Sequence, residues 1–354
     1  MKRIAIISIH GTTKAGGVEH VVARHARLLS EVASVRVFAL PQSGWTRSIR
    51  RSKIGNLLVC CAFSCTVSFR ARAWAGRNGV VITHAYGSIG ASCDALFAHG
   101  CWAGYMAHTG MRMGGFGRFI YSVEWLGAHL ARKVVGVSES VIDQWVRYYG
   151  LDHAKSDVQL NSVDTSVFFP RQSASDPCSD SSIRVLFVGR FEPGKGTAYL
   201  SHLHDEIASS GSLVQVLICS PADVTQDVRN RHPLFRFTTG LQPEEVAAEC
   251  NKADLFLLPS LYEGFELSSI EALACGTPVM LNDTGSRPTL QKLSCPGLFA
   301  LQNKQSPLDA VKLAHAAFRG LCRTDLARWA HAHFDGRTTR ASLLALCGLS
   351  ADSQ

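Results

Sequence analysis

The stretch YEGFELSSIEALACGTPV, from Tyr262 to Val279, indicates the fold of this 354-residue chain more clearly than any other segment. It follows an apolar run, ADLFLLPS, that predicts a buried strand. Its two glutamates, Glu263 and Glu271, are separated by seven residues across the expected strand-to-helix turn. The residues Gly-Thr-Pro then end the helix, and a new apolar strand begins. Acidic residues at the carboxyl end of a strand lie where open α/β sheets bind ligands.

Apolar strands alternate with helical patterns along the chain, which predicts parallel sheets flanked by helices. In the first half, strands are expected in RIAIISI, VRVFAL, VVIT, ALFA and VVGVS, and a helix is expected to start near Val18. The second half repeats the pattern with RVLFVG, LVQVLIC, FRFTT, DLFLLP and VMLN. We therefore predict an α/β fold of two doubly wound, Rossmann-like domains that face a cleft.

A segment rich in Ser, Asp and Pro, FPRQSASDPCSDSS, has the composition of a linker and covers residues 169–182. It divides the chain into an N-terminal domain, 1–168, and a C-terminal domain, 183–335. No internal repeat of solenoid length is visible, so two different domains are the simplest architecture.

The net charge of +8 is placed unevenly. Residues 1–168 carry 19 Lys and Arg but only 9 Asp and Glu, and no acidic residue occurs between Glu31 and Asp94. Such a face attracts anionic partners, such as a membrane surface, a phosphorylated acceptor or nucleic acid, unless it is simply solvated. We favour a peripheral contact of this basic domain with an anionic membrane or acceptor, and we expect no nucleic-acid partner.

The segment IGNLLVCCAFSCTVSF, residues 54–69, has basic residues on both sides. It is shorter than the roughly 18 apolar residues that span a bilayer, and we find no longer apolar run. We expect a buried core element, with an interfacial element that contacts lipid as the alternative. The chain begins MKRIAIISIH, which predicts a first strand rather than a signal peptide.

Cysteine and histidine do not form metal-binding patterns in this sequence. The 12 cysteines are scattered without CxxC pairs, and the 14 histidines include no HExxH. Such cysteine usage is typical of reduced thiols in the cytoplasm. We therefore expect no structural or catalytic zinc and no metal cofactor.

A glycine-rich turn, GRFEPGKGT, follows the first expected strand of the second domain. Glycine lets the backbone approach a ligand, and Arg190 and Lys195 offer donors for a phosphate group. A helix N-terminus after the turn would add its free N–H groups. The turn also matches the start of a P-loop, GxxxxGK, but the next residue is Gly196 rather than Ser or Thr. A P-loop-like nucleotide hydrolase is therefore the less favoured alternative.

The two glutamates of the opening stretch suit carbohydrate recognition, because a carboxylate can accept hydrogen bonds from two hydroxyls of a sugar or ribose. A structural interpretation also exists. Ser268 and Glu271 have the Ser-x-x-Glu spacing of a capping box, and Glu263 can be a simple turn residue. The phosphate turn that precedes both glutamates favours the ligand-binding interpretation.

Residues 183–285 resemble the donor domain of the retaining glycosyltransferases of family four, which have the GT-B fold. The matching segments are FVGRFEPGKG and ADLFLLPSLYEGFELSSIEALACGTPV, in this order and at this separation. The resemblance implies transfer of a sugar from a nucleotide-sugar donor to a glycan or lipid-linked acceptor, in polysaccharide or glycolipid biosynthesis. It implies no metal, and retention by front-face attack with the donor phosphate as base. A GT-B-like protein that binds sugar nucleotides or glycans without transfer is a further alternative.

The resemblance also implies roles for individual residues of the donor domain. Glu263 corresponds to the glutamate that contacts the donor sugar, and Glu271 to the one that contacts the nucleotide ribose. Arg190 and Lys195 correspond to the residues that bind the donor diphosphate. Backbone amides near the sugar and phosphate are those of Phe265, Glu266 and Leu267.

The first half resembles the acceptor domain of the family more loosely. GGVEHVVARHARLL is similar to the glycine-rich loop beside the diphosphate, which implicates Gly16 and Gly17. Glu19 is expected to be an acid in the first turn of the helix that follows. The last segment, residues 336–354, can form the helix that crosses back to the first domain in GT-B proteins.

One histidine of the first half matches the family's active site. Ala98-His99-Gly100 resembles the site of a catalytic histidine that bonds the donor sugar near the reacting centre. His84 and His10, each at the end of an expected strand, are weaker candidates.

Two segments depart from the family pattern. The family commonly has glycine or another small residue where this chain has Glu266, which we expect to influence the choice of sugar. After the next strand, the family usually shows a paired glycine and a glutamate. Here the sequence after Asn282 is DTGSRP, which changes the rear of the expected donor pocket.

Overall fold

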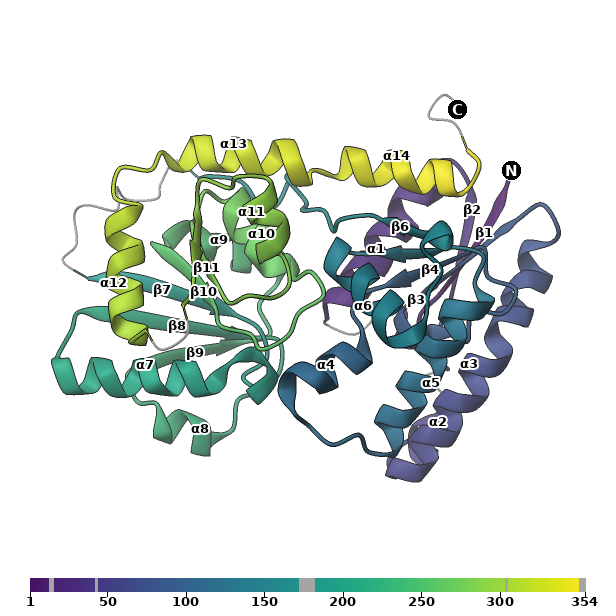
Figure 1. Ribbon diagram of the computed structural model, residues 1–354, viewed down its shortest axis with the longest axis horizontal. Helices are drawn as coiled ribbons and strands as arrows, with labels where there is room; N and C mark the ends of the chain where they lie inside the picture. Colours follow the sequence, from purple (N-terminus) through teal and green to yellow (C-terminus); the bar gives the residue numbers. More distant parts are fainter. Residues whose placement is uncertain (13–15, 42–43, 172–181, 303–304, 350–354) are drawn as a thin grey trace. The chain divides into compact units, whose positions relative to one another are not determined.

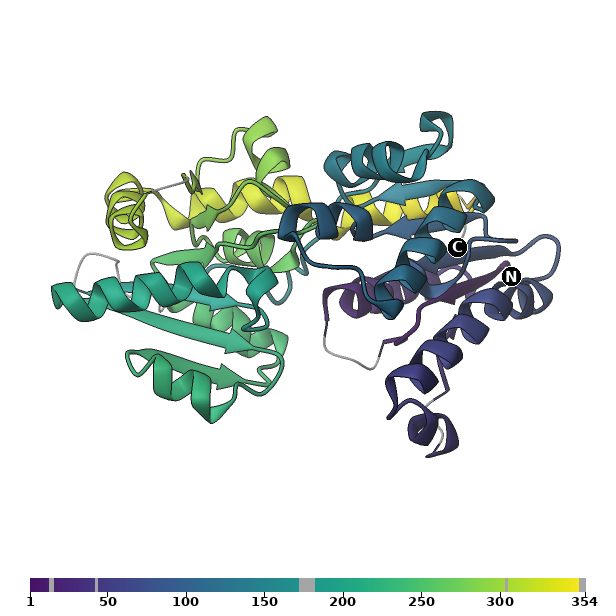
Figure 2. The ribbon, with the colours of Figure 1, turned by 60° about the horizontal axis from the view of Figure 1, so that its bottom comes forward.

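Each half of the chain folds around one six-stranded parallel sheet in the computed structural model, with helices on both faces (Figures 1 and 2). The structure describes residues 1–12, 16–41, 44–171, 182–302 and 305–349. Contacts divide it into unit 1, residues 1–161 with the segment from Arg337 onward, and unit 2, Ser162–Gly336. The predicted α/β fold with two doubly wound domains is confirmed.

Unit 1 has the strand order β2-β1-β3-β4-β5-β6. The strands are β1 (Arg3–Ile7), β2 (Ser34–Phe38), β3 (Val80–His84), β4 (Ala95–Ala98), β5 (Val134–Gly136) and β6 (Ser156–Val158). The helices are α1 (Gly17–Ser30), α2 (Gly44–Ile49), α3 (Lys53–Ala75), α4 (Trp102–Thr109), α5 (Gly115–Leu130), α6 (Glu139–Tyr149) and α14 (Gly336–Leu346). All predicted strands of this half form, and β6 is an additional one.

Alternation along β1 explains why helices cover both faces of this sheet. Ile4 and Ile6 belong to a core with α1 and α14, whereas Ala5 and Ile7 belong to a core with α3. All four are 0% exposed, because successive side chains of a strand point to opposite faces. A strand buried on both faces reads as the continuous apolar run by which we predicted it.

The apolar segment 54–69 lies within α3, a helix of 23 residues. Our expectation that no apolar segment is long enough to span a bilayer is wrong, because α3 meets that criterion by length and composition alone. The helix also contributes Cys60, Phe63 and Val67 to the core of unit 1, which is the expected core role. Core helices of soluble proteins meet the same criterion, so length and composition carry little weight by themselves.

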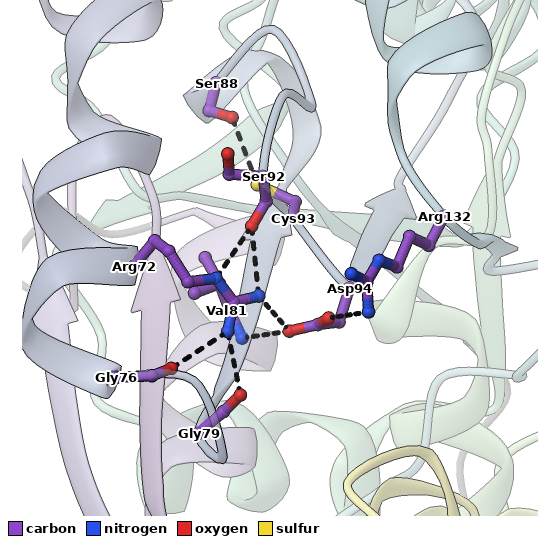
Figure 3. Close-up of polar contacts among 9 residues, drawn as sticks. All are labelled: Arg72, Gly76, Gly79, Val81, Ser88, Ser92, Cys93, Asp94 and Arg132. Atoms are coloured by element: carbon purple, nitrogen blue, oxygen red, sulfur yellow. Dashed lines mark hydrogen bonds and ion pairs between the residues drawn. The ribbon is translucent and has the colours of Figure 1, made fainter.

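An ion pair at the C-terminal end of α3 fixes the helix to the sheet (Figure 3). Arg72 Nη2 lies 2.5 Å from Asp94 Oδ2, and Arg72 Nη1 donates to the carbonyl oxygen of Gly79. The same Asp94 oxygen accepts a hydrogen bond from the backbone N–H of Val81 in β3. The carboxylate therefore connects α3, β3 and the start of β4.

Unit 2 has the strand order β12-β11-β10-β7-β8-β9. The strands are β7 (Ile183–Val188), β8 (Val214–Ser220), β9 (Phe235–Thr239), β10 (Leu255–Leu258), β11 (Val279–Leu281) and β12 (Leu298–Ala300). The helices are α7 (Thr197–Ser210), α8 (Gln226–Arg231), α9 (Pro243–Lys252), α10 (Leu267–Ala274), α11 (Arg287–Lys292), α12 (Pro307–Ala317) and α13 (Arg323–Phe334). The strand order reverses between β7 and β10, where doubly wound sheets bind ligands.

The division between the units falls at Asn161 and Ser162, before the linker expected at 169–182. Most of that expected linker lies outside the described residues. At the other end, α14 packs into unit 1, where Leu343 and Leu344 belong to the same core as Ile4. The C-terminal helix is therefore part of unit 1.

Replacing Asp94 with alanine should lower the free energy of unfolding of unit 1 by about 2 kcal/mol, because Arg72 and the N–H of Val81 lose their partner. Urea denaturation measures this change. The control is Asp157→Ala, which breaks an exposed pair with Lys133 and should cost about 0.5 kcal/mol or less. Equal losses in the two variants would contradict the anchoring role of Asp94.

Candidate functional site

Two of the residues predicted to bind the donor, Lys195 and Glu263, come together at the carboxyl ends of β7 and β10. Lys195 Nζ lies 2.6 Å from Glu263 Oε1, with side chains 22% and 13% exposed. The two residues follow neighbouring strands, so the parallel pairing of β7 with β10 brings them to one edge of the sheet. The structure thus places a partly buried ion pair at the point where the strand order reverses.

The turn that carries Lys195 depends on the glycine that follows it. Gly196 has φ +78°, and a Cβ atom there would lie 2.0 Å from the carbonyl oxygen of Pro259. Only glycine fits such a backbone conformation this close to another chain segment. A P-loop needs Ser or Thr at this position. The glycine instead lets the turn pack against the end of β10, and α7 begins at Thr197.

Arg190 lies on the same turn but makes a different contact. It pairs with Glu192 at 3.0 Å, and the two side chains are 61% and 41% exposed. An exposed pair of this kind contributes little to stability. Arg190 can therefore exchange its partner for an anionic ligand at small cost.

Glu271 does not form the capping box that was the structural alternative. Helix α10 begins at Leu267 with Glu266 as its N-cap, so Ser268 is already the second helical residue. The box needs the serine at the N-cap itself, and this interpretation is wrong. Glu271 is half-buried in the second turn of the helix.

Glu266 is buried, with 8% of its surface exposed, and its carboxyl group binds the loop after β11. Oε2 accepts a hydrogen bond from the backbone N–H of Ser286 at 2.9 Å, and Oε1 accepts one from its hydroxyl at 2.5 Å. Burial and the charge of Glu263 raise the pKa of Glu266. Nearby, Asn282 donates a hydrogen bond to the carbonyl oxygen of Ser260.

The two neighbours of Glu266 in the chain, Phe265 and Leu267, differ in burial. Phe265 is 4% exposed, and its ring packs 6.0 Å from that of Phe334 in α13. Leu267 is half-buried at the first position of α10. A backbone role, as the sequence analysis expects, is compatible with both positions.

In unit 1, His99 belongs to a group of three neighbouring histidine rings, called the histidine stack below, in which His84 and His99 are stacked and His25 is tilted by 59° against His84. His84 Nδ1 and His99 Nε2 lie 2.9 Å apart, and the His25 ring centroid lies 5.1 Å from that of His84. His84 also stacks on Phe97, with the ring planes 13° apart. Burial lowers the pKa of His25 to about 3 and that of His99 to about 4, and it lowers the pKa of His84 well below its usual value. The stack is neutral at neutral pH.

The position of the protons in this stack follows from burial. His84 is 1% exposed, and its Nε2 has no hydrogen-bond partner among the described residues. A buried N–H without an acceptor is rarer than a buried lone pair without a donor, so we assign the proton of His84 to Nδ1. That proton is donated to His99 Nε2, which leaves His99 protonated at Nδ1.

The loop that carries His99 is held from two helices. Trp145 Nε1 in α6 donates to the carbonyl oxygen of Gly100 at 2.7 Å. Glu124 in α5 accepts hydrogen bonds from the backbone N–H of Trp102 and from the hydroxyl of Tyr149. Burial raises the pKa of Glu124 to about 7. These contacts give the His99 loop a defined position at the N-terminus of α4.

The remaining candidates lie around the start of α1. Gly16 is the N-cap of this helix and Gly17 its first residue. A Cβ at Gly16 would lie 2.4 Å from a carboxylate oxygen of Glu19, a buried residue in the first turn. His10 is half-buried in the loop after β1. Within the described residues, no three His, Cys, Asp or Glu side chains are grouped to hold a metal ion.

Comparison with known proteins matches both halves of the chain to one group of enzymes. Residues 15–167 match the model of the Glycosyltransferase Family 4 domain, and residues 182–313 match that of Glycosyl transferases group 1. This chain belongs to the family 4 glycosyltransferases. The two matches include the histidine stack of unit 1 and the Lys195–Glu263 pair of unit 2.

Curated relatives of this family 4 chain match it over part of their length. An α-maltose-1-phosphate synthase of Mycolicibacterium smegmatis is 28% identical over 186 residues, which are 47% of each chain. A D-inositol 3-phosphate glycosyltransferase of Segniliparus rotundus is 29% identical over 218 residues, which are 56% of this chain and 48% of the relative. The chain thus spans about half the length of the curated relatives it matches.

Solved structures of glycosyltransferases resemble the whole fold. A sucrose-phosphate synthase from Thermosynechococcus elongatus has a TM-score of 0.73 at 18% identity and covers 98% of both chains. WaaG, a glycosyltransferase involved in lipopolysaccharide biosynthesis, has a TM-score of 0.72 at 15% identity and covers 98% of this chain and 100% of its own. At such identities the likeness concerns the fold alone, and the fold is GT-B.

Sequence reasoning missed His25, the third member of the histidine stack of this family 4 chain. A signal for it exists in α1, where His25 lies on the buried face with Val21, Val22 and Leu29. A polar residue on the apolar face of a helix needs a partner in the interior. Here its Nε2 lies 3.4 Å from the side-chain amide nitrogen of Gln159.

The lowered pKa values of His25 and His84 predict that unit 1 loses stability in acid. Below pH about 6.5 the unfolded chain binds protons that the folded stack excludes, so each histidine should subtract up to about 1.4 kcal/mol per pH unit. Unfolding free energies at pH 7, 6 and 5 measure the slope. His25→Asn should reduce it, whereas the same substitution at exposed His153 should not. An unchanged slope in His25→Asn would contradict the assignment.

Proposed function

We propose that this chain is a retaining, metal-independent glycosyltransferase that transfers a hexosyl group from a nucleotide sugar to a glycan or lipid-linked acceptor. The observation that carries this proposal is the Lys195–Glu263 pair where the strand order of unit 2 reverses. It is supported by Glu271 on the helix that follows and by the family of the chain.

Donor binding would exchange partners within this pair. The diphosphate of a nucleotide sugar carries more charge than one carboxylate, so it would take over the ammonium of Lys195. Glu263 would then accept hydrogen bonds from hydroxyls of the sugar, and Glu271 those of the ribose. Arg190 would leave its exposed contact with Glu192 and add a second cation. The N-termini of α7 and α10 would add backbone N–H groups.

The reaction breaks the bond between the anomeric carbon and the diphosphate. The sugar gains oxocarbenium character, as in glycoside hydrolysis, while the diphosphate gains negative charge. Lys195, which is partly buried at the edge of the sheet, would stabilise that charge, and the exposed Arg190 would add a second positive charge. The acceptor hydroxyl attacks on the face that the diphosphate leaves, with a donor phosphate oxygen as base, as is implied for this family. The configuration at the anomeric carbon is then retained.

Unit 1 would supply uncharged contacts to the reaction. His99 is neutral, and the hydrogen bond from His84 leaves its proton on Nδ1, from where it can be donated to a sugar oxygen. Gly16 and Gly17 at the N-terminus of α1 would bring backbone N–H groups to the diphosphate. A neutral donor suits a place next to a sugar that gains positive charge.

The outer face of α3 supports an acceptor at a membrane surface. Ile54, Leu58 and Phe69 are 73%, 63% and 56% exposed, and they lie four and eleven residues apart on one side of the helix. Exposed basic residues flank this stripe: Arg51 and Lys53 at one end, Arg70 and Arg77 at the other. An apolar stripe with basic ends binds the surface of an anionic bilayer. We propose such a peripheral contact on the cytoplasmic face.

Two alternative functions can be distinguished from sugar transfer. A P-loop-like nucleotide hydrolase is disfavoured by Gly196, because its contact with Pro259 leaves no room for the serine or threonine of a P-loop. A non-catalytic protein would bind sugar nucleotides without releasing free sugar or a glycosylated product. Product analysis with a labelled donor separates this case from a transferase.

Substitution of Lys195 should weaken nucleotide-sugar binding by about 10- to 100-fold, because one charge-assisted contact to the diphosphate is lost. Isothermal titration with UDP, ADP and GDP and their sugars measures this, with Lys195→Ala and Glu271→Ala as variants. Lys252→Ala, which removes an exposed lysine of the same unit, serves as the control. Wild-type affinity and donor turnover in both variants would refute this donor site.

Substitution on the outer face of α3 should weaken binding to vesicles that contain phosphatidylglycerol by about tenfold, because apolar area and the local positive potential both decrease. Co-sedimentation of Leu58→Asp measures the effect. The control is Leu213→Asp in unit 2, where the side chain is 62% exposed. Equal binding of the two variants, or binding that does not respond to salt, would contradict the proposed surface.

A further inference from the structure

Glu266 and the loop after β11, the two segments in which the sequence departs from the expected family pattern, are hydrogen-bonded to each other in the structure. We propose that Glu266 and Ser286 form one positioning device that holds Glu263 in place beside Lys195. This inference rests on the proposed function only for the role of Glu263, which is to contact the donor sugar.

The hydrogen bonds between Glu266 and Ser286 are buried, and each carboxyl oxygen of Glu266 accepts one of them. Ser286 is 0% exposed, and both its N–H and its hydroxyl donate to the carboxyl group of Glu266. The Ser286 hydroxyl also lies 3.0 Å from that of Ser269, which is 0% exposed as well. Polar networks of this kind fix a geometry because every broken bond leaves a buried group without a partner. The carboxyl oxygens of Glu266 are thus engaged with the protein rather than directed to a sugar.

The same loop clamps the backbone of Glu263. Thr284 Oγ1 accepts a hydrogen bond from the N–H of Glu263 at 2.9 Å and lies 3.4 Å from its carbonyl oxygen. Gly285 has φ +63°, and a Cβ there would lie 2.6 Å from Cβ of Glu263 and 2.1 Å from Oε2 of Glu266. The loop therefore fits closely between the two glutamates, and its position determines that of Glu263.

The side chains of Glu263 and Glu266 point to different loops. Glu263 reaches Lys195 in the turn after β7, whereas Glu266, three residues later, reaches the loop after β11. One carboxylate faces the proposed donor site and the other holds the segment behind it. Glu266 thus acts through Glu263, and it is a positioning residue rather than the direct selector of the sugar that its place in the sequence suggests.

The geometry also predicts that substitutions of Glu266 and Ser286 are coupled. Removing Glu266 alone leaves both the N–H and the hydroxyl of Ser286 without their acceptor, whereas removing both side chains leaves only the backbone N–H of position 286. Position 266 is the N-cap of α10, where glycine is well tolerated, and Ser286 has φ −74°, which any residue adopts. The double variant Glu266→Gly/Ser286→Ala should therefore behave better than Glu266→Gly alone.

The experiment compares the affinities for a nucleotide sugar and for its nucleoside diphosphate. Titrations use UDP with UDP-glucose and ADP with ADP-glucose, for wild type, Glu266→Gly, Ser286→Ala and the double variant. Both ligands carry the diphosphate, but only one carries the sugar that Glu263 would contact. We expect the ratio of the two dissociation constants to rise about tenfold in the single variants and to return to within about threefold of wild type in the double variant.

A purely structural loss would leave this ratio unchanged, because destabilisation affects both ligands equally. Ser209→Ala in the same unit, where the hydroxyl bonds only its own helix, is the matched control. Unchanged ratios in the single variants, or a double variant no better than Glu266→Gly, would overturn the proposal.

Failure of the proposed function has a different outcome from failure of this inference. If wild type binds none of the four ligands, the donor assignment fails. The melting temperatures of the variants then test whether Glu266 and Ser286 stabilise the fold as a pair. The single variants should melt about 4 °C below wild type, and the double variant should recover most of that loss. A double variant that loses the sum of both shifts would overturn the coupling as well.

Discussion

The parallel pairing of β7 with β10 is the constraint on which the candidate donor site depends. These strands are joined in register through Leu186 with Phe256, yet they are far apart in the chain. Their pairing is where the strand order reverses, and it brings a cation from one turn to a carboxylate from the other. Gly196 permits the close approach, because any side chain there would collide with the end of β10.

The sequence predicted those parts of the fold whose signal is local. Strands buried on both faces appear as apolar runs, and every predicted strand forms. The two additional strands, β6 and β12, contain no fully buried residue, so they leave no such run. The length of α3 was underestimated because the helix continues through Arg70 and Arg72, which looked like its boundary but face solvent and Asp94.

The contacts within the candidate site could not be predicted from the sequence. The motif made Lys195 and Glu263 candidates for ligand binding, but nothing in their spacing shows that their side chains contact each other. The capping box at Glu271 was a plausible local pattern that the true start of α10 excludes. The partnership of Glu266 with Ser286 needs the three-dimensional structure, because the partners are 20 residues apart on different loops.

The partly buried contact between Arg72 and Asp94 limits how deeply α3 can enter a bilayer. The helix carries exposed apolar residues and also holds Arg72, whose only carboxylate partner in the described structure lies at the start of β4. Full insertion would have to carry that guanidinium into hydrocarbon without its partner, at a cost of several kcal/mol. Any attachment of α3 to lipid would therefore be shallow and reversible as long as unit 1 keeps its fold.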